Sequence, residues 1–126
     1  MALISVVDDD IWVRESLDSL IRSVGMEVRA FASAEEFLGS VHPRKADCLI
    51  LDVRLPGMSG IELHHHLLAG RCNVPVIFIT AHASDEGARS EAESDWTVAY
   101  LSKPLDGDEL LDTINAALKL KSGLKA

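Results

Sequence analysis

Five strand-sized apolar runs alternate along the chain with segments that have the spacing of helices. The runs cover residues 3–7, 26–31, 47–53, 74–79 and 97–101. Apolar, β-branched runs of this length are typical of parallel strands buried on both faces. Their alternation with helices predicts an α/β sandwich, in which right-handed crossovers place helices on the faces of a parallel sheet.

Capping patterns indicate where the intervening helices begin. A serine followed three residues later by a glutamate is a capping box, and this pattern occurs at Ser33 with Glu36 and at Ser59 with Glu62. An apolar stripe on the first helix stops at Gly25, a residue type that commonly follows helix ends. The last helix is expected to begin at Asp106, with an apolar stripe formed by Leu110, Ile114, Ala117 and Leu118.

The segment between residues 84 and 96 departs from this pattern. Before Trp96, its only apolar side chains are Ala88 and Ala92. A helix is stabilised mainly by burying its apolar stripe, and two alanines offer little area. We therefore predict a fourth helix that is short, displaced or mobile, with Trp96 as a substitute anchor.

Length and charge limit the class of function. A chain of 126 residues suits one domain over residues 1–126, and its net charge of −8 argues against direct nucleic-acid binding. No apolar run is long enough to span a membrane, so no membrane association is expected. The two cysteines, Cys48 and Cys72, do not form a disulfide framework, and we expect a cytoplasmic location.

Four of the expected strands end in polar side chains that suit phosphate chemistry. They are Asp8 and Asp9 after the first run, Asp52 after the third, Thr80 after the fourth and Lys103 after the fifth. A parallel sheet brings these ends to one edge, where ligands of such sheets bind. Mg²⁺ relieves repulsion among carboxylates, while an ammonium and a hydroxyl neutralise phosphoryl oxygens on Asp52.

In this order and spacing the residues resemble the receiver domain of bacterial two-component response regulators, the CheY-like family. The resemblance covers nearly the whole chain and rests on Val6-Val7-Asp8-Asp9-Asp10, the run LDVRLPGMSG from Leu51 to Gly60, Ile79-Thr80-Ala81, and Lys103-Pro104. It implies a flavodoxin-like strand order 2-1-3-4-5 with helices on both faces. The stretch from Asp8 to Leu38 looks most like receivers of the LuxR-type, FixJ/NarL-like subfamily.

The resemblance also implies roles around the pocket. Asp52 would be the phosphoacceptor, and Mg²⁺, or Mn²⁺ in its place, would be held by Asp8, Asp9, Asp52 and the backbone carbonyl of Arg54. Family members of this kind are substrates and switches rather than conventional enzymes, although they assist their own phosphoryl transfer and dephosphorylation.

Further implied roles concern the phosphoryl group and its readout. Thr80 and Lys103 would bind the phosphoryl group, Tyr100 matches the aromatic switch position, and the small Ala81 would leave the group accessible. Lys103-Pro104 is expected to be a cis bond. Arg54 and His82 stand two residues past Asp52 and Thr80, where the family tunes phosphoryl lifetime; we hypothesise that Arg54 slows hydrolysis.

The implied partners are a sensor histidine kinase or a phosphotransfer protein, and an output domain or a second copy of the chain. Receivers dimerise through the face formed by the fourth helix, fifth strand and fifth helix, and the unusual segment 84–96 puts that mode in doubt here.

Other interpretations stay open on the residues alone. A Mg²⁺-dependent phosphatase with an aspartyl nucleophile would want a second acid where Arg54 stands. A non-phosphorylated binding module usually lacks pocket residues that this chain keeps, and a flavodoxin would need a phosphate loop where three aspartates stand. Asp10 is expected to cap a helix, and His64-His65-His66 to lie on the surface without a metal role because consecutive helical residues face different directions.

Overall fold

A single parallel sheet forms the middle layer of the molecule. The computed structural model describes the backbone of residues 1–40, 45–81 and 84–125, with side chains through residue 121. The strands are β1 (Leu3–Val7), β2 (Glu27–Phe31), β3 (Cys48–Asp52), β4 (Val76–Thr80) and β5 (Thr97–Ser102). They pair in the order β2-β1-β3-β4-β5, all parallel, which confirms the predicted topology.

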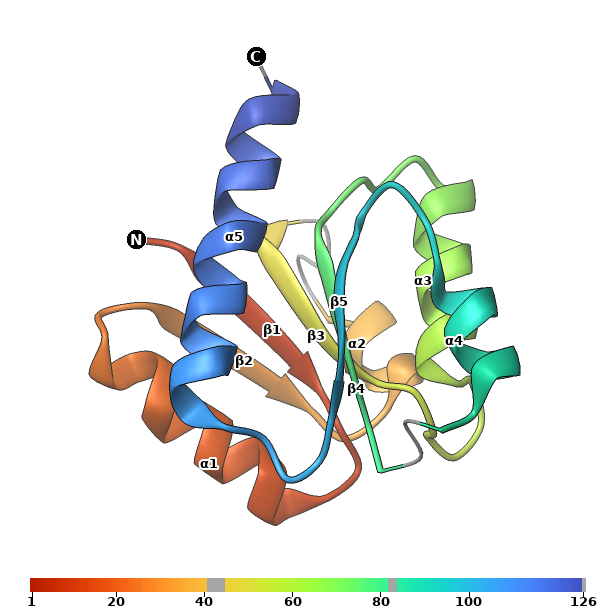
Figure 1. Ribbon diagram of the computed structural model, residues 1–126, viewed down its shortest axis with the longest axis horizontal. Helices are drawn as coiled ribbons and strands as arrows, with labels where there is room; N and C mark the ends of the chain where they lie inside the picture. Colours follow the sequence, from red (N-terminus) through yellow and green to blue (C-terminus); the bar gives the residue numbers. More distant parts are fainter. Residues whose placement is uncertain (41–44, 82–83, 126) are drawn as a thin grey trace.

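Helices cover both faces of this sheet (Figure 1). They are α1 (Ile11–Ser23), α2 (Ala34–Leu38), α3 (Gly60–Ala69), α4 (Glu86–Ala92) and α5 (Gly107–Lys125). The helices α1 and α5 lie on one face, and α2, α3 and α4 lie on the other (Figure 1). The three-layer α/β sandwich is therefore confirmed. Within the described residues, no helix combines the length and the apolar character of a membrane span.

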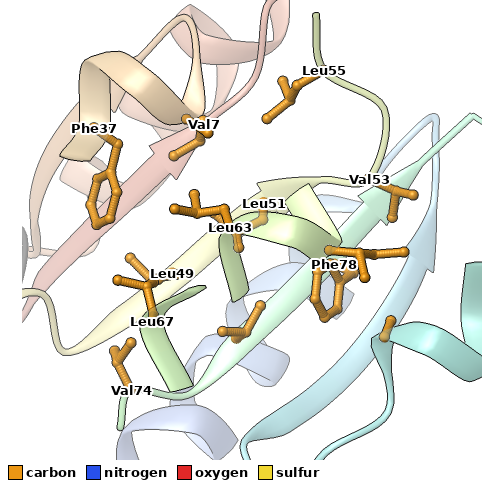
Figure 2. Packing of buried hydrophobic residues seen from close by; sticks show 14 of the residues in the cluster. Val7, Phe37, Leu49, Leu51, Val53, Leu55, Leu63, Leu67, Val74 and Phe78 are labelled. Atoms are coloured by element: carbon orange, nitrogen blue, oxygen red, sulfur yellow. The ribbon is translucent and has the colours of Figure 1, made fainter. Parts of the chain in front are cut away.

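Two apolar cores lie between the sheet and its two helical layers. Every residue of β1, β3 and β4 is buried, whereas β2 and β5 form the half-exposed edges. Figure 2 shows the core beneath α2 and α3, where Phe37 and Leu63 pack with Leu49, Leu51 and Phe78. Burial of both strand faces explains why the central runs are apolar throughout rather than alternating.

The predicted caps hold the helix starts in place. Asp10 caps α1 by accepting a hydrogen bond from the backbone of Trp12, and Ser33 caps α2. Ser59 and Glu62 form the reciprocal capping box of α3. Each cap fixes the start of the helix that follows a strand, and it thereby limits the path of the loop between that strand and helix.

The fourth helix is short, as predicted, but Trp96 does not anchor it. The helix α4 has seven residues, of which Ala92 is buried and Ala88 packs partly against the core. Trp96 is half-buried and belongs to neither core, so the expected substitute anchor is wrong.

Polar contacts with α3 hold the end of α4 instead. The Nε2 atom of His64 lies 2.8 Å from the Ser94 hydroxyl, and Nε2 of His65 lies 2.9 Å from the Glu91 carbonyl oxygen. His64 is buried with 1% of its surface exposed, so the expectation that the whole histidine run lies on the surface is wrong for this residue. His65 and His66 are exposed as expected.

Candidate functional site

Three carboxylates meet where β1 and β3 end. Oxygens of Asp8, Asp9 and Asp52 all lie within 4.8 Å of one another. Asp8 is fully buried, Asp52 is 6% exposed, and Asp9 is exposed at the rim. The central strands β1 and β3 are hydrogen-bonded neighbours, and their shared register brings Val7 beside Leu51, immediately before the acidic residues.

Lys103 reaches into this cluster from the end of β5. Its Nζ atom lies 2.9 Å from Oδ2 of Asp8 and 3.0 Å from Oδ2 of Asp52. Burial lowers the pKa of Lys103, but hydrogen bonds and charges from the two aspartates more than offset this and leave the pKa raised. Lys103 therefore stays protonated and bridges the two buried carboxylates.

Burial is the main influence on Asp52. It raises the pKa of the Asp52 carboxyl, and the charge of Asp8 raises it further. Hydrogen bonds from Lys103 and from the backbone of Arg54 oppose this effect without cancelling it. Ionising Asp52 in this buried position therefore costs free energy. Additional positive charge in the pocket would stabilise the ionised carboxylate.

Backbone contacts fix the acidic residues. Oδ1 of Asp8 accepts a hydrogen bond from the backbone N–H of Asp10 at 2.9 Å, and the Asp8 carbonyl oxygen accepts one from Nη1 of Arg14 at 2.7 Å. The backbone N–H of Arg54 donates to Oδ1 of Asp52 at 3.1 Å. Position 60, at the start of α3, requires glycine, because a Cβ there would collide with the Asp52 carbonyl oxygen.

The loop after Asp52 is clamped from the neighbouring helix. Gly57 has a φ of 74°, which glycine adopts easily, and the next backbone N–H, that of Met58, donates to Oε2 of Glu35 at 3.0 Å. That hydrogen bond lowers the pKa of Glu35. The clamp joins α2 to the loop that carries Arg54, and the sequence pattern did not reveal it.

Thr80 and Tyr100 lie on the neighbouring strands β4 and β5. Thr80 is buried at the end of β4, with exposed Ala81 next to it, and its carbonyl oxygen accepts from the backbone N–H of Lys103 at 2.8 Å. Burial raises the pKa of Tyr100, and Asp85 raises it further, while Arg89, Thr80 and Arg54 oppose the shift. The Lys103–Pro104 peptide bond is cis.

The side chain of Arg54 pairs with the carboxylate that caps α4. Its Nη2 atom lies 3.1 Å from Oδ2 of Asp85, the residue that caps α4. His82, the other residue expected to tune phosphoryl lifetime, lies outside the described residues. The structure thus brings Asp8, Asp9, Asp52 and Lys103 together, with Thr80 at the neighbouring strand end.

The acidic cluster fits a divalent cation. Three carboxylates and one ammonium leave two negative charges without compensation among these four groups. Mg²⁺ prefers oxygen ligands and keeps several waters, so a cluster with one exposed and two buried carboxylates suits it. Receiver domains bind Mg²⁺ at an acidic cluster of this kind, here formed by Asp8, Asp9 and Asp52.

Comparison with known proteins identifies the family. Residues 4–115 match the response regulator receiver domain. Nodulation protein W of Bradyrhizobium diazoefficiens is 47% identical over 116 residues, which is 92% of this chain and 51% of that protein. The transcriptional regulatory protein FixJ of the same organism is 35% identical over 92% of this chain and 56% of its own length.

Solved structures give the same result. The response regulator StyR superposes with a TM-score of 0.86 at 40% identity, covering 98% of this chain and 62% of that one. The chain spans about half the length of the curated relatives it matches. FixJ among the relatives confirms the expected LuxR-type subfamily. The chain therefore belongs to the response regulator receiver domains, the CheY-like signalling domains that carry the phosphorylatable aspartate of two-component phosphorelays.

Proposed function

We propose that Asp52 accepts the phosphoryl group, and that the donor is a phosphohistidine on a sensor histidine kinase or a phosphotransfer protein. The observation that carries this assignment is the position of Oδ2 of Asp52, 3.0 Å from the Lys103 ammonium and in the same cluster as Asp8 and Asp9. Among the three carboxylates, Asp8 is fully buried and Asp9 is exposed at the rim, whereas Asp52 lies beside the Lys103 ammonium and keeps 6% of its surface exposed.

In the transfer step, an Asp52 carboxylate oxygen attacks phosphorus and forms an acyl O–P bond. The P–N bond of the donor breaks, and the imidazole leaves with the electron pair and takes up a proton. Lys103 and the Thr80 hydroxyl would neutralise the equatorial oxygens as charge spreads over them. Mg²⁺, or Mn²⁺ in its place, would supply further positive charge, held by Asp8, Asp9, Asp52 and the backbone carbonyl of Arg54.

Hydrolysis of the acyl phosphate ends the signal. A water oxygen attacks phosphorus, the acyl O–P bond breaks, and Asp52 regains its carboxylate while inorganic phosphate and a proton are released. We propose that the domain assists this step with the same charged groups. The exposed Ala81 leaves the group open to water, and the Arg54 side chain and His82 set how fast water reaches it.

Thr80 and Tyr100 are proposed to carry the signal away from the pocket. Tyr100 of β5 is paired with Phe78 of β4, and their ring centroids lie 6.2 Å apart. The Arg89 guanidinium lies 5.4 Å from the centroid of the Tyr100 ring. A movement of Thr80 toward the phosphoryl group would change the space available to Tyr100 and hence the position of α4. Partner surfaces near α4, β5 and α5 would then differ between the two states.

We further propose that residues 1–126 form one receiver and that its output lies in another domain or in a second copy of the chain. Relatives of about twice the matched length support an output domain. Dimerisation through α4, β5 and α5 is less favoured, because α4 has seven residues and little apolar surface. Both described cysteines are free, which agrees with a cytoplasmic location. The net charge of −8 agrees with a receiver that does not itself bind nucleic acid.

Incubation with acetyl phosphate and Mg²⁺ tests the assignment. Intact-mass spectrometry should detect one phosphoryl adduct in the wild-type chain and none in Asp52→Asn. An adduct that persists in Asp52→Asn would overturn the role of Asp52. Sustained turnover of a small phosphate ester would instead support a phosphatase.

A further inference from the structure

Arg54 contacts both the phosphoacceptor and the fourth helix. Its backbone N–H donates to Oδ1 of Asp52, and its guanidinium pairs through Nη2 with Oδ2 of Asp85, each at 3.1 Å. The other carboxylate oxygen of Asp85, Oδ1, accepts the backbone N–H of Ala88 at 3.0 Å and thereby caps α4. A continuous series of contacts therefore runs from Asp52 through Arg54 and Asp85 to the first turn of α4.

The start of this helix has little apolar packing, whereas polar contacts with α3 hold its C-terminal end. The helix has seven residues, and its apolar contribution to the core comes from Ala88 and Ala92. Asp85 also lies close enough to Tyr100 to raise the pKa of its hydroxyl. A change at Asp85 would therefore alter both the start of α4 and the electrostatic surroundings of Tyr100.

The ion pair between Arg54 and Asp85 is easily exchanged. The side chains are 59% and 39% exposed, and exposed pairs contribute little to stability because water and salt screen them. A phosphoryl group on Asp52 would carry nearly two negative charges and three strong acceptor oxygens, which match the fork of a guanidinium. It would arise two residues from Arg54, whose backbone already contacts the accepting carboxylate.

We propose that Arg54 and Asp85 form a clasp that phosphorylation of Asp52 opens. The Arg54 guanidinium passes from Asp85 to the phosphoryl oxygens, where it shields them from water, and α4 loses the ion pair that steadies its cap. Asp85 is then a positioning residue: it acts on the lifetime of the phosphoryl group by holding Arg54 away from it. This inference rests on the proposed phosphorylation of Asp52 and adds a specific route to α4.

A double-mutant cycle tests the clasp. Asp85→Asn removes the charge but keeps a side chain that caps helices as well as aspartate does. Because Arg54 is released, the phosphoryl lifetime should lengthen about two- to fivefold, the range that an exposed ion pair spans. In an Arg54→Gln background, the same Asp85→Asn change should leave the lifetime unchanged. Asp112→Asn, which removes an exposed carboxylate on α5, is the matched control and should not alter the lifetime.

Hydrogen exchange of residues 84–92 provides the second readout. Without phosphoryl donor, both Asp85→Asn and Arg54→Gln should speed exchange in α4 about two- to fivefold, and phosphorylation of the wild-type chain should do the same. The clasp is wrong if Asp85→Asn shifts the lifetime equally in both Arg54 backgrounds, or if wild-type α4 exchanges at one rate with and without the adduct. Intact mass is recorded in parallel, so a chain that gains no adduct at all refutes the proposed function and the opening step together, while the unphosphorylated comparison still tests the ion pair itself.

Discussion

Removal of Lys103 should destabilise the fold through the two carboxylates that it bridges. In Lys103→Met, the apolar stem is kept while the ammonium that lies 2.9 Å from Asp8 and 3.0 Å from Asp52 is lost. At about 3 Å and an effective dielectric constant of about 20, each pair attracts by roughly 5–6 kcal/mol before desolvation. Breaking a buried pair costs about 3–5 kcal/mol after desolvation is counted.

The lower end of that range applies here, because 21% of the Lys103 side chain is exposed. We therefore expect the free energy of unfolding to fall by about 3 kcal/mol at pH 7 in a chelator. Urea denaturation followed by circular dichroism measures this change. Lys119→Met is the matched control, since this exposed lysine on α5 should change stability by less than about 0.5 kcal/mol.

The loss should depend on pH and on Mg²⁺. Without Lys103 the pKa of Asp52, already raised by burial, rises further, so stability is lost as pH increases from the ordinary value of 3.8 through the raised pKa. The difference from wild type should consequently shrink toward pH 4, and saturating Mg²⁺ should recover part of it at pH 7. A loss below about 1 kcal/mol at pH 7, or one that does not change with pH, would refute the bridging role of Lys103.

Three further predictions concern other parts of the site and its support. Burial lowers the pKa of His64 from 6.5 to about 4, so its neutral form contributes stability that is present above pH 6.5 and lost as pH falls toward 4. In His64→Leu, the fall in the free energy of unfolding between pH 6.5 and pH 4 should be smaller than in the wild type by up to about 3 kcal/mol. Urea denaturation at several pH values measures this, and the same fall in both chains would contradict the prediction. In Gly60→Ala the added Cβ meets the Asp52 carbonyl oxygen, so thermal denaturation should reveal a loss of at least about 1–3 kcal/mol; an unchanged midpoint would mean that the loop relaxes freely. Mg²⁺ at ten times its dissociation constant should stabilise the wild-type chain by about 1.4 kcal/mol, and a chelator should reverse the effect. Asp9→Asn should weaken this stabilisation, and an equal response in both chains would remove Asp9 from the ligand set.

The sequence predicts those features of the fold that local chemistry determines. The apolar runs and the serine–glutamate caps place the strands and helix starts, because each depends on residues within a few positions of one another. The acidic cluster is also predictable, since parallel strands bring their carboxyl ends to one edge of the sheet wherever the chain supplies a strand.

Long-range polar contacts away from the strand ends escaped prediction. The partner of Arg54 lies 31 residues away, and the Ser94 partner of His64 lies 30 residues away, so no local pattern links them. A signal for His64 was present: it stands midway between Ile61 and Leu67 at a spacing of three, on the stripe that α3 buries. Three consecutive histidines hid this stripe. Trp96 was expected to be an anchor because the segment before it has only two alanines as apolar side chains, whereas polar contacts from α3 hold that end of α4.

Reductive mapping of the phosphorylated carboxylate tests the central assignment most directly. Borohydride reduces an acyl phosphate to the alcohol, so a phosphorylated aspartate becomes homoserine, which peptide sequencing by mass spectrometry locates. After treatment with acetyl phosphate and Mg²⁺, we expect homoserine at position 52 alone. Asp8 and Asp9 are the alternatives, because their carboxylate oxygens lie within 4.8 Å of an Asp52 carboxylate oxygen. Homoserine at position 8 or 9, or none at position 52 in a chain that carries the adduct, would contradict the role of Asp52.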